Sequence, residues 1–196
     1  LGGIVPGDTL LLLLSNESDI SALFEGILDH SSDNKIPVQH FIFRKSNPAQ
    51  VQKQRNYKVI EYNPDEIKPK IFVNKFIQQL SAVKNKSVVI IDGLYHLHES
   101  GVTEKNFLLL FQKLTDICRK KKLFTVVFLR RDLSDLKLIA NLKDIPSICL
   151  DIIRFKDELY CLPISLKGRY RPSELVPFNI TMALKESSLK SIQIIS

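Results

Sequence analysis

Residues 9–14 read Thr-Leu-Leu-Leu-Leu-Leu, and residues 15–21, which follow directly, read Ser-Asn-Glu-Ser-Asp-Ile-Ser. A short apolar run without polar alternation predicts a β-strand that is buried on both faces of a sheet. Ser18 or Asp19 can then cap a helix, because a short polar side chain accepts hydrogen bonds from the free N–H groups at a helix start. The apolar residues of that helix recur on one face: Leu23, Phe24, Ile27 and Leu28. The chain therefore begins with a strand, an acidic loop and a helix.

Strand and helix patterns alternate through residue 146. Further strands are predicted at Val38–Phe43, Tyr57–Tyr62, Ser87–Ile91 and Leu123–Leu129. Helices are predicted from about Ile71, from Thr103 to Lys122 and, after a basic turn, as a short helix between Arg130 and Asp144. This alternation is typical of an α/β protein with a mostly parallel central sheet flanked by helices.

After residue 146 the pattern changes to short strands joined by tight turns. Strands are predicted at Ile148–Phe155, Leu159–Leu166, Pro177–Met182 and Ser191–Ile195. Turns as short as Lys156-Asp157 join antiparallel neighbours, and Pro163 indicates an edge strand or a bulge because proline has no N–H to donate. We therefore expect a single domain, 1–196, with an α/β core at 1–146 and an antiparallel β-hairpin extension at 147–196.

The composition is that of an ordinary globular chain. Of its 196 residues, 44% are hydrophobic and 25% are charged, which suffices for one domain with a sizeable core. The longest purely apolar run, Leu10–Leu14, is far too short to cross a membrane, and no signal-peptide pattern is visible. Cys118, Cys149 and Cys161 lack metal-ligand spacing and are expected to be reduced, buried thiols. These features predict a cytoplasmic protein that does not contact a membrane.

Basic residues outnumber acidic ones, giving a net charge of +7 and a pI of about 9.3. Such a surface favours anionic partners such as nucleic acid, and lysine and arginine supply affinity that is independent of sequence. The cations gather at predicted helix and strand ends: Arg119–Lys122, Arg130, Arg131, Lys137, Lys143, Lys167, Arg169 and Arg171. The alternative is a solvated basic face, in which the Arg119–Lys122 cations complement the carbonyl end of their helix.

Three stretches stand in a fixed order along the chain. Residues 1–10 read Leu-Gly-Gly-Ile-Val-Pro-Gly-Asp-Thr-Leu, residues 88–94 read Val-Val-Ile-Ile-Asp-Gly-Leu, and residues 166–170 read Leu-Lys-Gly-Arg-Tyr ahead of Pro177–Ile180. In this order the chain resembles the RecA superfamily, and within it the KaiC-like proteins and RadA relatives. The stretches are similar to the family's lead-in to its first strand, to its Walker B strand, and to its terminal Lys-x-Arg hairpin with the closing strand. The resemblance implies a RecA-like fold.

The loop at residues 15–21 departs from the phosphate-binding pattern of that family, GxxxxGK[ST]. There, glycines turn backbone N–H groups toward phosphate, a lysine reaches the terminal phosphates and a hydroxyl ligates magnesium. Here the loop has no glycine and no lysine, and Glu17 and Asp19 would face the nucleotide. Two like charges ~4 Å apart repel by about 4 kcal/mol at an effective dielectric of 20. Ser21 remains as a vestige of the hydroxyl.

A second departure follows the second predicted strand. The resemblance implies acidic residues just beyond it, one of which polarises the attacking water, but Val38–Phe43 runs into Arg44-Lys45. Arginine keeps its proton at every accessible pH, so it does not serve as a base. We interpret both nucleotide binding and catalysis as lost and expect no cofactor. Phosphate binding by Arg44 and Lys45 from a new direction stays an alternative.

Asp92 corresponds to the aspartate that orients magnesium in working P-loop enzymes. Without the glycines and lysine it is vestigial, and its bland interpretation is a strand-end residue that caps the turn at Gly93. His96, His98 and Glu99 follow closely and raise the alternative of a metal site. Zinc takes three or four well-placed protein ligands, so we favour loop histidines and expect no metal.

These observations predict a non-catalytic pseudo-ATPase that acts as an interaction or regulatory subunit. It would assemble with itself or with RecA/KaiC-like relatives. The first alternative is a nucleic-acid-binding RecA-like protein in DNA repair or RNA handling, since the resemblance places a DNA-contacting loop near Arg130 and Arg131. The hairpin with Lys167, Arg169 and Arg171 would reach a neighbouring subunit. The second alternative is a KaiC-like ATPase with an atypical ATP site.

Overall fold

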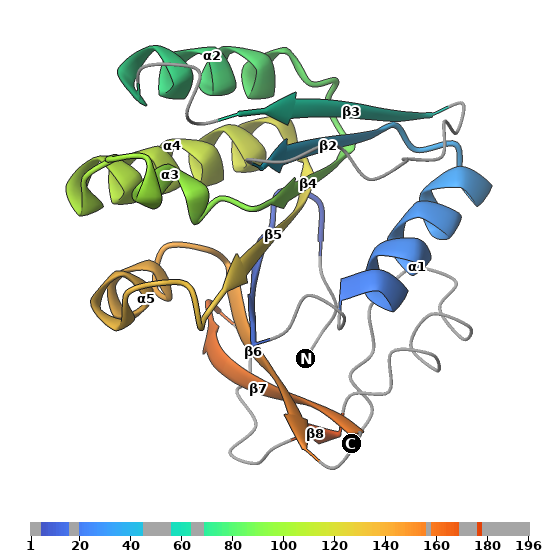
Figure 1. Cartoon of the computed structure of the whole chain (residues 1–196). Helices are drawn as coiled ribbons and strands as arrows, with labels where there is room; N and C mark the ends of the chain where they lie inside the picture. The colour runs from blue at the N-terminus through green and yellow to red at the C-terminus, as the bar shows by residue number, and fades with distance from the viewer. Residues whose placement is uncertain are drawn as a thin grey trace.

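The computed structural model describes residues 5–15, 20–44, 56–63, 69–155, 158–168 and 176–177, and these form one continuous sheet with helices on both faces (Figure 1). The strands are β1 (Thr9–Leu14), β2 (Val38–Phe43), β3 (Tyr57–Tyr62), β4 (Val88–Asp92), β5 (Phe124–Arg130), β6 (Ile148–Phe155), β7 (Glu158–Leu166) and β8 (Val176–Pro177). The helices are α1 (Ile20–Asp33), α2 (Pro69–Ala82), α3 (His96–Glu99), α4 (Glu104–Lys121) and α5 (Leu136–Leu142). The expected α/β class is confirmed.

The strand order is β3-β2-β4-β5-β1-β6-β7-β8. The strands from β3 to β6 run parallel, and β7 returns antiparallel to β6. The expected antiparallel extension is therefore confirmed for the β6–β7 pair. The β6–β7 register shifts between Cys149 and Leu150, opposite Pro163, which confirms that the proline marks an irregularity. The strand expected at Pro177–Met182 lies almost wholly outside the described residues, and the one at Ser191–Ile195 lies entirely outside them.

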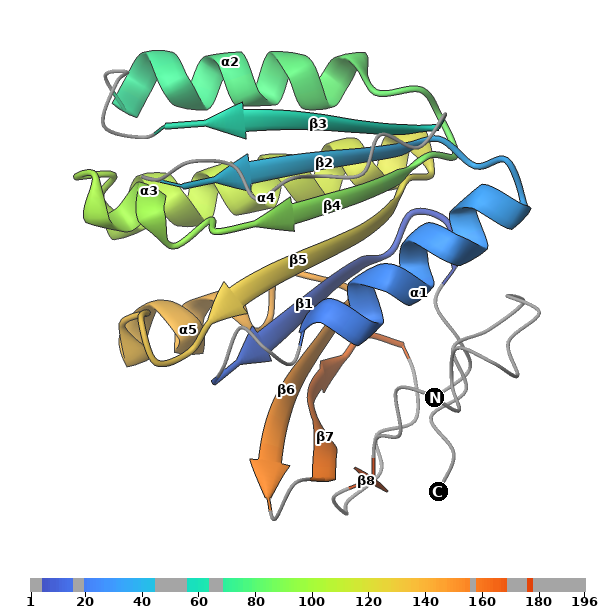
Figure 2. The same ribbon diagram turned by 45° about the vertical axis from the view of Figure 1, so that its right-hand side comes forward.

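Helix α1 covers one face of the sheet, and α2, α4 and α5 cover the other (Figure 2). The division follows from the pleat, because alternate side chains of a strand point to opposite faces. Leu11 and Leu13 enter the core under α2 and α4, while Leu10, Leu12 and Leu14 enter the core under α1. All five leucines are at most 3% exposed, so the prediction of a strand buried on both faces is confirmed.

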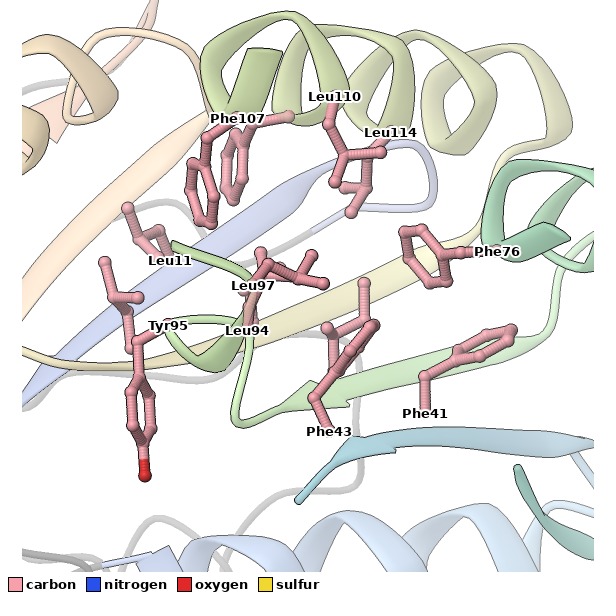
Figure 3. Packing of buried hydrophobic residues seen from close by; sticks show 14 of the residues in the cluster. Leu11, Phe41, Phe43, Phe76, Leu94, Tyr95, Leu97, Phe107, Leu110 and Leu114 are labelled. Carbon is pink, nitrogen blue, oxygen red and sulfur yellow. The ribbon is translucent and has the colours of Figure 1, made fainter. Parts of the chain in front are cut away.

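The larger core lies between the sheet and helices α2 to α5 (Figure 3). Phe107, Leu110 and Leu114 of α4 recur at helical spacing and are fully buried against the strands. On β2, Phe41 and Phe43 each pack a ring edge against Phe76 of α2, with ring centroids 5.2 and 5.4 Å apart. Aromatic pairs of this geometry contribute about 1 kcal/mol beyond their buried area.

The smaller core under α1 contains a buried histidine. His40 of β2 is 5% exposed, and its Nδ1 lies 2.6 Å from the Tyr57 hydroxyl of β3. The ring of Phe24 on α1 packs against the His40 ring, with centroids 5.0 Å apart and ring planes tilted by 48°. Its Nε2 has no hydrogen-bond partner among the described residues. Burial, followed by the nearby charge of Arg44, lowers the pKa of His40 from 6.5 to about 3.

Acid is expected to weaken the fold through this histidine. The folded pKa lies below the unfolded one, so the stability contributed by the neutral ring is complete above about pH 6.5 and is lost as the pH falls toward 3. The loss amounts to about 5 kcal/mol at most. Urea unfolding between neutral and mildly acidic pH measures it.

The variant His40→Leu should flatten that pH dependence, because leucine has no proton to gain. His98→Gln is the matched control, since His98 is exposed and should leave the slope as in the wild type. A His40→Leu protein whose stability still falls like the wild type between pH 6.5 and pH 4 would contradict the assignment.

Candidate functional site

The carboxyl ends of the parallel strands form the edge where the predicted site residues of β2, β4 and β5 meet. After β1 the chain runs through α1 on one face of the sheet and continues into β2. After β5 it runs through α5 on the opposite face and continues into β6. Neighbouring strands β1 and β5 therefore leave in opposite directions, which makes a topological switch point. Open α/β sheets bind their ligands in the crevice at such a point.

Arg44 and Asp92 form an ion pair at this edge. Arg44 directly follows β2, Asp92 ends β4, and the Arg44 Nη2 atom donates to Asp92 Oδ2 at 3.2 Å. The side chains are 40% and 23% exposed, so the pair contributes about 1 kcal/mol or less to stability. The chemical consequence of the pair is larger, because the Arg44 guanidinium already binds the Asp92 carboxylate, which a metal ion would need as a ligand. Asp92 was expected to cap the turn at Gly93. In the structure its side chain binds Arg44, which is 48 residues away in sequence.

Gly93 allows the ends of β2 and β4 to lie close together. Its φ is +75°, and a Cβ atom there would lie 2.1 Å from the Phe43 carbonyl oxygen. Any side chain would push the ends of β2 and β4 apart, since backbone does not yield at that distance. The glycine therefore keeps Arg44 within reach of Asp92.

Arg131 and Asp151 form a second, more buried pair. Arg131 follows β5, its backbone N–H donates to the Leu14 carbonyl at 2.7 Å, and its Nη1 donates to Asp151 Oδ2 at 2.6 Å. The Asp151 side chain is 8% exposed, and its Oδ1 has no hydrogen-bond partner within the described part of the chain. Burial raises the pKa of Asp151 above its ordinary value, and the charge of Arg131 offsets only part of that effect.

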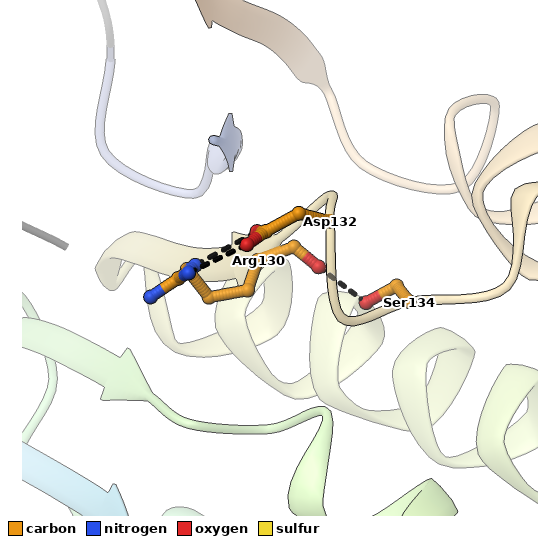
Figure 4. Close-up of polar contacts among 3 residues, drawn as sticks. All are labelled: Arg130, Asp132 and Ser134. Atoms are coloured by element: carbon orange, nitrogen blue, oxygen red, sulfur yellow. Dashed lines mark hydrogen bonds and ion pairs between the residues drawn. The ribbon is translucent and has the colours of Figure 1, made fainter. Parts of the chain in front are cut away.

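Arg130 binds Asp132 through two parallel hydrogen bonds, Nε to Oδ1 at 2.8 Å and Nη2 to Oδ2 at 2.6 Å (Figure 4). The Ser134 hydroxyl donates to the Arg130 carbonyl at 2.6 Å and closes the turn into α5. Hydrogen bonding from Arg130 holds the pKa of Asp132 below its ordinary value. This two-point geometry is the strong form of an arginine–carboxylate contact.

Five arginines were expected to contact nucleic acid or a partner, and the three that the structure describes, Arg44, Arg130 and Arg131, are each bound to a carboxylate. Lys167 does not join them. Its Nζ donates to the Ile145 carbonyl at 2.9 Å, beside the start of β6, so it lies at the opposite, amino end of the sheet. Lys45, Arg169 and Arg171 lie outside the described residues. Ser21 lies in the first turn of α1, and its side chain is outside the described part.

His96 and His98 were expected to lie in a loop. They lie instead in the short helix α3. The His96 Nδ1 atom lies 2.7 Å from Glu99 Oε2, one turn further on. No cluster of three or more His, Cys, Asp or Glu side chains that could hold a metal occurs among the described residues. Within the same residues, no helix is long and apolar enough to span a membrane.

The sequence analysis singled out Asp92 but missed the other two acidic partners, Asp132 and Asp151. Asp151 carried a signal, since it is the one charge inside an otherwise apolar stretch, Ile148–Ile153. A charge in a buried strand needs a partner, which pointed to an arginine nearby. Asp132 carried no such signal, because a polar residue in a turn is ordinary.

No known family model matches the chain, and no curated protein matches it either.

The variant Asp151→Asn tests the electrostatics of the buried pair. Because the folded pKa of Asp151 is raised, the native state binds its proton more tightly, and the ionised form lowers stability above the ordinary carboxylate range. We expect Asp151→Asn to raise the free energy of unfolding at neutral pH and to lose that advantage as the pH falls toward 4.

Asp132→Asn is the matched control, since the pKa of Asp132 is shifted the opposite way. It should lower stability slightly at neutral pH and not raise it. Denaturant unfolding of both variants measures the difference. A loss of about 3 kcal/mol or more in Asp151→Asn, the usual penalty for breaking a buried pair, would contradict the expectation.

Proposed function

We propose that the protein is a non-catalytic pseudo-ATPase of RecA-like architecture that acts by binding partners. The observation that carries this proposal is the ion pair of Arg44 with Asp92. In a working P-loop ATPase the aspartate at the end of this strand faces magnesium. Here it faces an arginine of the same chain, and a divalent cation would have to displace that guanidinium against its positive charge.

The arrangement of the sheet supports the RecA-like part of the proposal. Strand β1 precedes the acidic segment that leads into α1 and stands at the switch point, where a nucleotide would bind. Strand β4 carries Asp92 and is separated from β1 by one strand, β5, as in ATPases of the RecA type. The scaffold of a nucleotide site is thus kept, while the loop lacks glycine and lysine.

An apolar tip at the same edge supports a role in binding partners. Leu133 in the turn after β5 is 47% exposed, and Leu136 at the start of α5 is 76% exposed. Both follow Asp132, the partner of Arg130, within four residues. Exposed large apolar residues beside a few ordered charges are typical of protein contact surfaces. We propose that a second copy of the chain, or a RecA/KaiC-like relative, docks on this tip.

Nucleic-acid binding through Arg130 and Arg131 gains no support, because both arginines already bind carboxylates. An ATP site of atypical design gains no support either, since Arg44 is engaged by Asp92 and not held ready for phosphate. Both alternatives stay predictions of the sequence.

Titration of ATP with magnesium into the protein tests the loss of the nucleotide site. We expect no binding heat, because the loop supplies no phosphate donors and Asp92 is neutralised by Arg44. Micromolar binding that disappears in Asp92→Ala would contradict the pseudo-ATPase assignment. Binding that survives in Asp92→Ala would contradict it as well, by placing a phosphate site elsewhere at this edge.

The variant Leu136→Asp tests the contact surface. We expect the assembled species to fall at least tenfold in affinity, because a charge at the centre of an apolar contact is desolvated without a partner. Folding should be unaffected, since Leu136 is exposed and an acidic residue favours the first turn of a helix. Light scattering after size exclusion measures the assembly.

Leu109→Asp is the matched control. Leu109 is 46% exposed on α4 and lies on the outer face of that helix. It should leave assembly unchanged. A strictly monomeric wild type, or equal loss in both variants, would contradict the proposed surface.

A further inference from the structure

Three lysines at the amino end of the sheet adopt a left-handed backbone conformation. Their φ angles are 53° at Lys35, 60° at Lys86 and 53° at Lys122, and among the described residues they are the only non-glycine positions with positive φ. Each ends the turn that joins a helix to a strand: α1 to β2, α2 to β4, and α4 to β5. Left-handed positions at helix ends are usually filled by glycine, because a Cβ atom there is strained.

The three lysines stand in a row. Val38, Val88 and Phe124 are paired across the adjacent strands β2, β4 and β5, and each lysine precedes its strand by two or three residues. Figure 2 shows the three connections side by side at the right-hand end of the sheet. Adjacent strands are about 4.8 Å apart, so the row is on the order of 10 Å long. A hydrogen bond from the Lys86 N–H to the Lys121 carbonyl ties two of the connections together.

The segment before β1 has a glycine in the corresponding left-handed position. Gly7 precedes β1 by two residues, has a φ of +103°, and donates its N–H to the Leu123 carbonyl. Glycine thus fills the left-handed place before β1, and lysine fills it before β2, β4 and β5. Residues held in strained conformations cluster at functional sites. Lysine differs from glycine at these three positions by adding a positive charge, so we look for a role of that charge.

Further cations flank the row, and few acids balance them. Lys84 is exposed in the connection from α2 to β4, and Arg119 and Lys120 are exposed in the last turn of α4. The nearby carboxylates are Asp8, Asp33 and Asp116. Neither these three flanking cations nor the three left-handed lysines take part in any ion pair given for the described residues. The arginines of the carboxyl edge, by contrast, are bound to acids. Among the described residues, the amino edge therefore carries more cations than acids.

We propose that the amino edge of the sheet binds the phosphate backbone of double-stranded nucleic acid through Lys35, Lys86 and Lys122. The partner's chemistry follows from what the edge contains and lacks. Residues 33–37, 83–87 and 119–123 have no aromatic side chain, so the stacking that single-strand binders use is missing there. Duplex carries one negative charge per about 1.7 Å of its axis, the densest array for a row of lysines.

A membrane surface fits this edge less well. The apolar side chains of the connections, Ile36, Val83 and Leu123, are buried or half-buried and offer nothing for insertion into lipid. The contact is electrostatic and independent of base sequence, because lysine side chains at a flat edge reach phosphates and not base edges. This surface lies at the opposite end of the strands from the carboxyl edge, and the proposal does not rest on the pseudo-ATPase assignment.

The test uses a triple variant, Lys35→Gly, Lys86→Gly and Lys122→Gly, in the full chain. Glycine relieves the left-handed strain, so the thermal midpoint should stay the same or rise, and a failure to fold is not expected. The control triple, Lys75→Gln, Lys105→Gln and Lys113→Gln, removes the same three charges from exposed positions on the outer faces of α2 and α4. Fluorescence anisotropy with a labelled random-sequence DNA duplex measures binding over a series of salt concentrations.

The wild type should bind with a steep salt dependence. The glycine triple should bind about tenfold or more weakly at moderate salt, and the slope of log affinity against log salt should fall by about 2 to 3. The control triple should keep nearly the wild-type slope. Equal losses in both triples would overturn the proposal, since net charge alone would then explain binding. Binding to phosphatidylserine vesicles without binding to duplex, or no binding to either probe, would overturn it too.

Discussion

The burial of β1 on both faces is the constraint on which the rest of the structure depends. Leu10 to Leu14 stand at the centre of the sheet between β5 and β6, and they link the core under α1 to the core under α2 and α4. A strand buried in this way needs helices on both sides, and here α1, after β1, covers one face while α5, after the neighbouring β5, covers the other. The switch point at the end of β1, with Arg131 hydrogen-bonded to Leu14, is a direct result. The topological switch point thus follows from hydrophobic burial and does not require a ligand.

Patterns local in sequence predicted most of the fold, and contacts distant in sequence were missed. The bounds of β1, β2 and β3 follow from apolar runs and turn residues, and α4 follows from its helical spacing. Helix α3 was missed because four residues are too few to show a period. The pairing of Arg44 with Asp92 was missed because the two residues are 48 apart, and only the parallel register of β2 with β4 brings them together.

The same limit explains the grouping of the basic residues. In the sequence, Arg130, Arg131 and Lys167 look like members of one basic surface. The direction of the strands separates them, because β5 ends at the carboxyl edge and β7 returns to the amino edge. Whether an arginine is free also depends on carboxylates elsewhere in the fold, as Asp151 on β6 shows. Composition therefore measures how much charge the chain carries, and topology decides where that charge is uncompensated.

The two edges of the sheet act as independent surfaces. A strand of six residues, such as β2, is about 20 Å long, whereas charges in physiological salt are screened beyond about 8 Å. The acidic partners of the carboxyl edge therefore do not neutralise the lysines of the amino edge, and a net charge of +7 understates the local field there. The ion pairs of the carboxyl edge, Arg44 with Asp92 and Arg131 with Asp151, consequently place no restriction on what the lysines of the amino edge can bind.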